Sequence, residues 1–464
     1  MPRLTASGTK DIGPAAPPPK ERVSIATRLS GYWYRLSRDP LSRNSLFIVA
    51  TTLVNSALGY VFWVVGARLF PASAVGIVAA TISAGSVVGI LAYAGVGMTL
   101  IHSLPQVRKD REWSDTLLAG TGTAALIGLG GAMIVVAALP LLSAKFALLH
   151  QFPNAAIFVL GTGAWSLGSA LDYAFIAERS AHLMLVRNTI HAAAKLLVAG
   201  LLVWVAVKTP TFLLLAWSAA AVIGGLVGAA LLWKWLGRGR LSRPRWADLV
   251  ARANFLRRRL WGHQVVSISG QLPPLLLPVL VTARISARAD AFFYLTWLVT
   301  GVLLVVSAAV ADALFTEGAY QPAELRSRAW FALKLVMAVA IPLMVAFLVG
   351  GGLILSVFGP AYAAHALLLL RLLALAAVPD AITNLYVALL RVRSRFLAAG
   401  ALNLGMGAGT LVASWFLLPV FGITGAGVAW IGMQICGSLY CGVDLLHRRV
   451  RATPLAVAGT GAKR

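Results

Sequence analysis

Four polar residues with one recurring spacing are the best candidates for chemistry in this sequence. Asp172 and Lys195 are 23 residues apart, and Asp380 and Asn403 have the same separation. All four lie within long apolar runs, where an ionised side chain is costly unless it faces a partner or water. This placement predicts that they line a polar passage or form buried polar pairs.

Lys195 is the first candidate cation. If Asp172 and Lys195 lie on neighbouring antiparallel helices, their depths differ by roughly 6 Å at 1.5 Å per residue, a gap that a flexible lysine can close. The two residues then either line an anion-binding cavity or form a purely structural ion pair. We favour the cavity, because a transporter of anions has a use for a cation at mid-depth. His191, one turn before Lys195, is interpreted as a helix-packing hydrogen bonder.

Arg371 is the second candidate cation, and its alternative role is to pair two helices or to reach the membrane surface. It lies nine residues before Asp380, which places the two on opposite faces of a regular helix. Pro379 would distort such a helix locally. Asn384, one turn after Asp380, adds an amide to the face of Asp380.

Membrane-spanning helices must position these residues. The 464-residue chain is 59% hydrophobic, with a mean hydropathy of +0.82, which excludes an ordinary soluble globule. Its apolar runs are about 20 residues long, enough to cross a hydrocarbon layer of ~30 Å. We predict twelve spans, at residues 44–67, 74–102, 115–142, 154–177, 183–207, 211–234, 260–283, 290–314, 329–356, 362–387, 396–418 and 423–446.

The basic residues orient these spans. The net charge is +25, and segments on one side of the predicted membrane hold 32 Lys and Arg against five on the other. The positive-inside rule then places both termini in the cytoplasm. Because the charge is divided among short connecting segments, we expect contact with membrane lipids and not with nucleic acid. We expect a multi-pass protein of the bacterial cytoplasmic (inner) membrane.

The chain divides into two pseudo-symmetric halves around a central basic segment. Residues 66–69 (GARL) match residues 282–285 (TARI) at an offset of 216, which also places Asn55 on Gln271. An offset of 208 places Asp172 on Asp380 and Lys195 on Asn403. Paired halves are common in transporters. The predicted units are a basic tail with an interfacial helix at 1–43, a six-helix lobe at 44–234, a basic linker at 235–259, a six-helix lobe at 260–446 and a tail at 447–464.

Three prolines occur within six residues of the seventh span. Pro273, Pro274 and Pro278 each remove a backbone donor and clash with the preceding turn. We expect a broken helix that lines a cavity and acts as a gate or hinge. Cys436 and Cys441 have no metal-type spacing and are expected to pack as small apolar residues. We expect no metal and no cofactor.

Several short motifs resemble the polysaccharide-biosynthesis flippases, the Wzx-type oligosaccharide-lipid flippases of the multidrug/oligosaccharidyl-lipid/polysaccharide (MOP) exporter superfamily. The motifs are 67–71 (ARLFP) with Gly76, 358–362 (FGPAY), 370–372 (LRL) and 418–426 (LPVFGITGA). The resemblance covers about residues 40–450 and identifies the family better than its substrate.

The resemblance implies an all-α, MATE-like fold of two six-helix lobes around a cavity that opens alternately to each side. The implied cargo is an undecaprenyl-diphosphate-linked oligosaccharide for exopolysaccharide, capsule or O-antigen synthesis, and the implied partners include glycan polymerase and export machinery. Lys195 and Arg371 would attract the diphosphate, modulated by Asp172 and Asp380. The amides would bind sugar hydroxyls, and the candidates are Asn55, Gln271, Asn384 and Asn403.

Other functions remain open from the sequence. A multidrug or cation antiporter of the same superfamily would use acidic coupling residues, and Asp172 is compatible with that role. A membrane-embedded polysaccharide polymerase would need a catalytic carboxylate pair outside the membrane, and Asp290 is nearly the only carboxylate in the predicted outward segments. We therefore expect a transporter and not an enzyme. A structural scaffold would leave the buried charges unexplained.

Overall fold

The computed structural model describes residues 40–204, 208–242, 249, 251–252, 264–320 and 324–452, and these residues form helices and loops without any strand. The N-terminal helices are α2 (Pro40–Leu69), α3 (Ala72–Ser103), α4 (Asp110–Leu142), α5 (Phe152–Ala177), α6 (Ala181–Trp204) and α7 (Pro210–Leu232). The C-terminal helices are α9 (Gln264–Arg284), α10 (Ala287–Tyr320), α11 (Leu325–Ser356), α12 (Pro360–Leu375), α13 (Ala377–Val392), α14 (Phe396–Phe421) and α15 (Ile423–Ala452). Short helical turns η1 (Leu104–Gln106), η2 (Ala144–His150) and η3 (Trp233–Gly237) join some of them.

In this described part of the chain, ten helices are long and apolar enough to cross a membrane, with α12 and α13 counted as one. The remaining predicted spans coincide with α6 and α9, which carry polar residues and prolines that lower their hydropathy. The chain is therefore a multi-pass membrane protein. The count of twelve spans and the cytoplasmic placement of the termini stay predictions.

The points at which one helix ends and the next begins follow from the local sequence. Gly359 and Gly422 have φ angles of 137° and 61°, which glycine adopts at little cost, and they separate α11 from α12 and α14 from α15. The tenth predicted span is interrupted at Ala376, three residues before Pro379, as the lost backbone donor of proline predicts.

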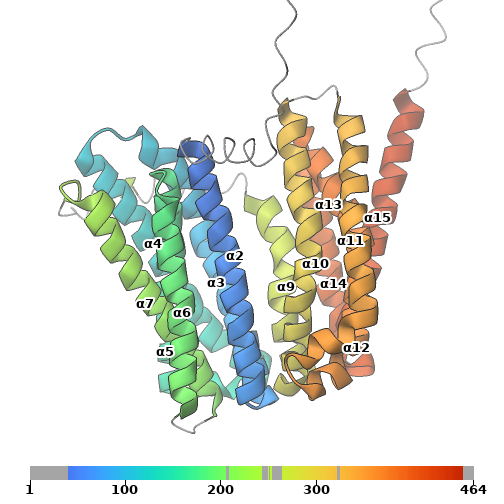
Figure 1. Ribbon diagram of the computed structural model, residues 1–464, viewed down its shortest axis with the longest axis horizontal. Helices are drawn as coiled ribbons and strands as arrows, with labels where there is room; N and C mark the ends of the chain where they lie inside the picture. The colour runs from blue at the N-terminus through green and yellow to red at the C-terminus, as the bar shows by residue number, and fades with distance from the viewer. Residues whose placement is uncertain are drawn as a thin grey trace, which may run out of the picture.

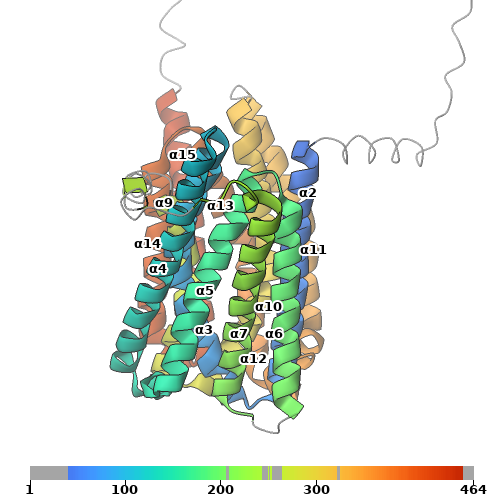
Figure 2. The same cartoon turned by 90° about the vertical axis from the view of Figure 1, so that its left-hand side faces the viewer.

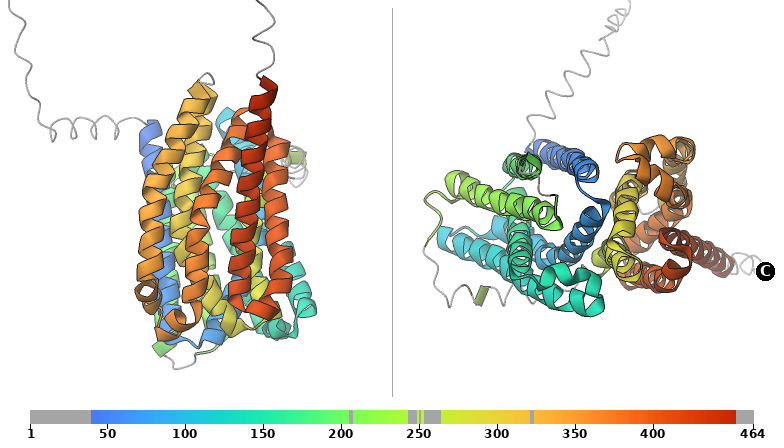
Figure 3. Two further views of the ribbon diagram at one scale, coloured as in Figure 1. Left: turned by 90° about the vertical axis from the view of Figure 1, so that its right-hand side faces the viewer. Right: turned by 90° about the horizontal axis from the view of Figure 1, so that it is seen from below.

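The helices form two lobes that lie side by side, α2–α7 in one and α9–α15 in the other (Figure 1). The view along the helices shows the same division (Figure 3, right), and the first lobe faces the viewer in Figure 2. The start of α2 and the end of α15 lie at the same end of the bundle (Figure 1). Because both termini are predicted to be cytoplasmic, we call this the inner end and the opposite one the outer end.

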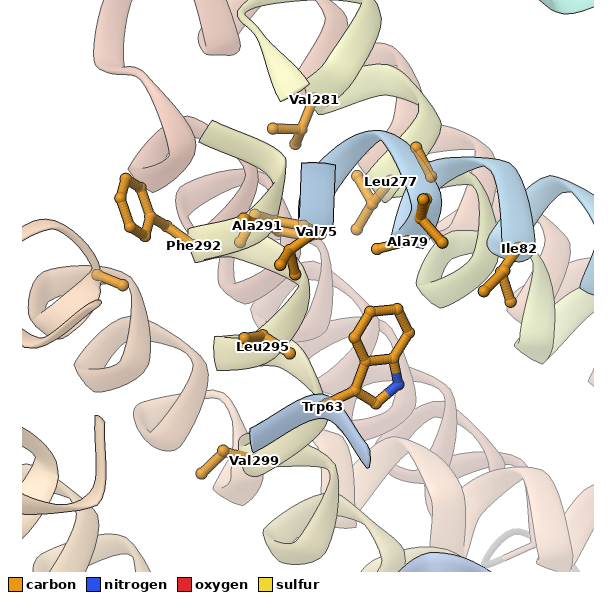
Figure 4. Close-up of a cluster of buried hydrophobic side chains, with 14 of the residues drawn as sticks. Trp63, Val75, Ala79, Ile82, Leu277, Val281, Ala291, Phe292, Leu295 and Val299 are labelled. Atoms are coloured by element: carbon orange, nitrogen blue, oxygen red, sulfur yellow. The ribbon is translucent and has the colours of Figure 1, made fainter. Parts of the chain in front are cut away.

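The lobes share one apolar core, here called the outer seam, at which α3 packs against α9 and α10. Val75, Ala79 and Ile82 of the first lobe face Leu277 and Leu295 of the second (Figure 4). The helices approach so closely that a Cβ placed on Gly76 would lie 1.6 Å from the carbonyl oxygen of Ala287. Only glycine permits this contact.

Two cations tie the outer seam to main-chain oxygens of the opposite lobe. Arg68 donates from Nε to Val357 O (2.8 Å) and from Nη2 to Ser356 O (2.8 Å). Lys145 donates from Nζ to the carbonyl oxygens of Ala283 (3.0 Å) and Ile285 (2.7 Å). These carbonyls lie at the C-terminal ends of α11 and α9, where the helix dipole attracts positive charge.

The inner ends of the lobes have separate cores. One cluster around Leu100, Trp113 and Phe175 contains residues of the first lobe alone. Two others, around Leu314 and Tyr386, contain residues of the second lobe alone. Shared packing is thus concentrated toward the outer end.

One prediction about the helices is wrong. The helix α9 is continuous from Gln264 to Arg284, with Pro273, Pro274 and Pro278 inside it, and is not a broken span. Pro273 packs against Gly407 of α14, where a Cβ would lie 3.1 Å from the proline ring. Tertiary packing therefore holds the helix across the prolines. The predicted interfacial helix in residues 22–38 lies outside the described residues, as does most of the basic segment 246–259.

Candidate functional site

A polar network inside the first lobe is built on Asp172 of α5. Arg187 of α6 donates to both of its carboxylate oxygens, from Nε to Oδ1 (2.8 Å) and from Nη2 to Oδ2 (2.7 Å). Asn188 donates from Nδ2 to Oδ2 (3.0 Å), and Asn55 of α2 donates to Asn188 Oδ1 (2.9 Å). The network joins three helices through one carboxylate and one guanidinium.

The burial of this pair matters for its role. The side chain of Arg187 is 4% exposed and that of Asp172 is 13% exposed. A two-point guanidinium–carboxylate contact has the geometry that best offsets the cost of burying two charges. The first network is therefore close to neutral and rigid.

The prediction that Asp172 acts with Lys195 is wrong. We predicted that Asp172 modulates Lys195, but Asp172 pairs with Arg187, two turns before Lys195 on α6. Arg187 is near the start of the predicted span 183–207 and is not among the predicted site residues, and in the structure it lies inside α6 and is buried. Apolar runs do not show on which face of a helix a boundary arginine points.

Lys195 lies between α6 and α2 and has no carboxylate within 4.0 Å in the described part of the chain. Its Nζ lies 4.9 Å from the ring centroid of Phe62, which is a cation–π contact. His191, on the same helix, bonds through Nδ1 to the carbonyl oxygen of Ala220 (2.9 Å). This geometry fits the packing role predicted for His191, and it leaves the ammonium of Lys195 without a salt bridge among the described residues.

A second network in the other lobe is built on Asp380 of α13. Ser307 of α10 donates to Oδ2 (2.5 Å), Asn384 donates to the same oxygen (2.9 Å) and Gln434 of α15 donates to Oδ1 (3.2 Å). Asp380 is 6% exposed. The three donors are neutral, and no cation pairs with Asp380 among the described residues.

The two networks occupy equivalent places in the lobes but differ in charge. Asp172 and Asp380 correspond at the offset of 208, and the residue that corresponds to Arg187 is Arg395. Arg395 is exposed at the start of α14, so it does not reach Asp380. One lobe thus holds a compensated carboxylate and the other holds a carboxylate bound only by neutral groups.

The remaining predicted site residues are dispersed. Arg371 is exposed and donates from Nε to the Leu348 carbonyl oxygen of α11 (3.3 Å), which matches the helix-pairing alternative. Gln271 is exposed, and Asn403 lies beside Gly270 of α9. The structure therefore does not bring Arg371 and Lys195 together, and it joins Asn384 to Asp380 and Asn55 to Asp172.

Sequence reasoning missed four members of the networks, which are Arg187, Asn188, Ser307 and Gln434. Gln434 was visible as an amide within an apolar run, and Asn188 as a polar residue beside Arg187. Ser307 carried no such signal, because serine is common inside membrane helices. In the described residues, no group of three or more His, Cys, Asp or Glu is arranged to hold a metal ion.

Comparison with known proteins identifies the fold. No family model matches the chain, and no curated protein matches it. Similar solved structures include an inward-facing multidrug-resistance MATE family transporter of the MOP superfamily, with a TM-score of 0.66 and 14% identity over 86% of this chain and 96% of that one. The inward-closed lipid II flippase MurJ has a TM-score of 0.67 and 12% identity over 86% and 87%.

A third similar structure is a MOP superfamily transporter from Pyrococcus furiosus, described as having a binding pocket of reversed polarity. Its TM-score is 0.59 at 13% identity, over 90% of this chain and 96% of that one. All three cover nearly the whole chain. The protein has the MATE/MOP-like fold of two helical lobes.

Proposed function

We propose that this protein is a flippase of the bacterial inner membrane that moves a lipid-linked oligosaccharide, carried on undecaprenyl diphosphate, from the cytoplasmic to the outer leaflet by alternating access. The fold supports a transport role, because its structural relatives are a multidrug transporter and a lipid II flippase. The motifs of the polysaccharide flippases favour the lipid-linked glycan as cargo. The proposal includes no enzymatic step.

The observation that carries the proposal is the placement of Lys195. Its ammonium lies within a helix predicted to span the membrane, near the ring of Phe62 and without an acidic partner in the described residues. An uncompensated cation at this depth is expensive. Binding of a phosphate-bearing headgroup would supply the missing negative charge.

The network around Asp172 gives this cation a fixed setting. Arg187 neutralises Asp172, so the carboxylate does not cancel the field of Lys195. Asn55 is held by the same network and is the amide that can meet a sugar hydroxyl, because both ends of the Asn188 amide are already hydrogen-bonded. Arg371 is assigned to helix pairing, and its role in substrate binding is not retained in the proposal.

A transport assay tests the role of Lys195. Purified protein in liposomes would receive a polyprenyl-diphosphate oligosaccharide with a fluorescent sugar, and a membrane-impermeant reductant would report the glycan that reaches the outer leaflet. We expect Lys195→Ala and Lys195→Met to lose most transport, because Met keeps the side-chain length without the charge. Lys208→Ala, which removes a lysine from the segment between α6 and α7, is the matched control. Transport at the unmodified rate by both Lys195 variants would refute the assignment.

A multidrug or cation antiporter is the second candidate, and Asp380 favours it. A buried carboxylate that is surrounded by neutral donors can accept a proton or a monovalent cation. Drug-susceptibility measurements on cells that express the protein separate the two functions. Resistance that depends on Asp380, together with absent glycan transport in liposomes, would establish the antiporter.

A further inference from the structure

We propose that the outer seam carries a second binding site, for a phosphate group presented from the outer side of the membrane. A cavity of about 520 Å³ opens at the seam. Its lining includes Arg68 and Ser73 of the first lobe with Arg288, Phe292 and Tyr362 of the second. No carboxylate belongs to the lining, so the two guanidinium groups give the cavity a positive field.

The donors of Arg68 are only partly used. A guanidinium has five N–H groups, and Arg68 gives one from Nε and one from Nη2 to the carbonyls at the end of α11. Three N–H groups remain, and they belong to a side chain whose orientation is already fixed. Arg288 is exposed and makes no ion pair with any residue that the structure describes. A phosphate oxygen can therefore accept from both arginines without loss of the Arg68 contacts.

The start of α12 adds further donors. This 16-residue helix begins at Pro360 after Gly359, and no side chain caps it. Pro360 has no N–H and that of Tyr362 donates to Gly359 O (3.1 Å), so the N–H of Ala361 and the helix dipole are what favour an anion at this helix start. Tyr362, in the first turn, lines the cavity and is 3% exposed, and its hydroxyl lacks a hydrogen-bond partner within the described residues. A buried hydroxyl is normally bonded, so this one points to a missing acceptor.

The depth of the cavity indicates which phosphate could reach it. It lies where α2 ends and α12 begins, at the outer ends of the helices, and the predicted spans place this level at the lipid headgroups. The rings of Phe292 and Phe358 form an apolar part of its lining. A phosphate attached to a lipid and a free phosphate share the recognised chemistry. The assignment to the transported lipid's headgroup rests on the proposed function.

Occupation of this site would hold the outer seam closed. The cavity is formed by residues of both lobes, so its ligand bridges the lobes only while they are together. A ligand that binds one state of a two-state protein shifts the population toward that state. Phosphate on the outer side is therefore expected to slow the opening of the outer seam, as feedback from delivered product would.

Binding would be measured by calorimetry on the full chain in phosphatidylcholine nanodiscs, with inorganic pyrophosphate and with farnesyl diphosphate as probes. We expect Arg68→Ala and Arg288→Ala each to weaken binding at least about tenfold, because a charge-assisted hydrogen bond is worth more than the corresponding 1.4 kcal/mol. Lys208→Ala should bind as the unmodified protein does. If Arg68→Ala fails to fold, Arg288→Ala still tests the site, because Arg288 is exposed and its replacement is expected to leave the fold intact.

The two probes distinguish the source of the phosphate. Tighter binding of farnesyl diphosphate supports a lipid headgroup, and equal binding supports free phosphate. Absent binding, or equal binding by Arg68→Ala, Arg288→Ala and the unmodified protein, would overturn the site. If pyrophosphate binds through the arginines but no lipid-linked glycan is transported, the proposed function fails and the site stands.

A second readout tests the bridging of the lobes. Val75→Cys, in a background with Cys436 and Cys441 replaced by alanine, places a thiol in the seam, where Val75 is fully buried. Its labelling by a polar maleimide reports opening of the outer seam. We expect pyrophosphate to slow this labelling, and the effect should vanish with Arg288→Ala. Faster or unchanged labelling in the presence of bound pyrophosphate would exclude the bridging role.

Discussion

Arg187 and Asp172 form a two-point ion pair between α6 and α5, with contacts of 2.8 and 2.7 Å. The pair fixes the turn that joins these helices and gives Asn188 and Asn55 a common anchor. Because the carboxylate of Asp172 is paired with Arg187, it does not pair with Lys195. The proposed function needs Lys195 without an acidic partner.

Loss of one member of this pair should destabilise the protein strongly. We expect Arg187→Leu or Asp172→Leu alone to cost about 3–5 kcal/mol, because each leaves an uncompensated buried charge. The double variant should recover much of this loss. Thermal unfolding of the detergent-solubilised protein in a double-mutant cycle measures the coupling. The exposed pair Arg391–Asp312 is the control, for which an effect of about 0–1 kcal/mol is expected. Additive losses for the buried pair would contradict the interpretation.

Gly76 should control closure of the outer seam. A methyl group at this position would collide with the Ala287 carbonyl of α10, and overpacking of this kind costs roughly 1–3 kcal/mol. We expect Gly76→Ala to raise maleimide labelling of Val75→Cys about fivefold or more. Gly59→Ala is the control, since a Cβ there meets nothing within 4 Å. Equal labelling of the two variants would show that the helices tolerate the methyl group by shifting.

Lys145 should contribute to the same closure through a different contact. Lys145→Ala removes two donors from the carbonyls at the end of α9. Because charged hydrogen bonds contribute about 1.5–3 kcal/mol when well formed, we expect faster labelling of Val75→Cys with little change in thermal stability within each lobe. Lys208→Ala should leave the labelling rate unchanged. A variant that labels at the original rate would mean that Arg68 and the apolar packing suffice.

Asp380 should be needed as an acceptor for three buried donors. Asp380→Ala leaves the groups of Ser307, Asn384 and Gln434 without this partner, and each unsatisfied buried group costs about 1–3 kcal/mol. We expect a large fall in the unfolding temperature for Asp380→Ala and a smaller one for Asp380→Asn, which keeps an acceptor oxygen. Asp312→Ala, at an exposed carboxylate, is the control. Equal losses for the two Asp380 variants would show that the negative charge itself stabilises the network.

Much of the architecture could be predicted from apolar run lengths and the repeated halves. The helices coincide with the predicted spans, and the correspondence of Asp172 and Asp380 identified both network centres before their partners were known. These features depend on spacing along one chain, which the sequence contains directly.

The partners could not be predicted, because they depend on helix rotation and packing. Arg187 stands near the start of the predicted span 183–207, where the sequence does not show its orientation, and its side chain turns inward to Asp172. Arg371 lies within a helix, as predicted, but it contacts a backbone oxygen of α11. The continuity of α9 likewise depends on α14, which packs against Pro273.

The hydrogen bonds of Arg68 and Lys145 across the outer seam have peptide oxygens as acceptors, those of Ser356, Val357, Ala283 and Ile285. A peptide oxygen does not titrate, and substitution of the residue that bears it leaves it in place. These hydrogen bonds should therefore persist at an acidic pH that would protonate a carboxylate. Among side chains, only those of Arg68 and Lys145 can be substituted to change them.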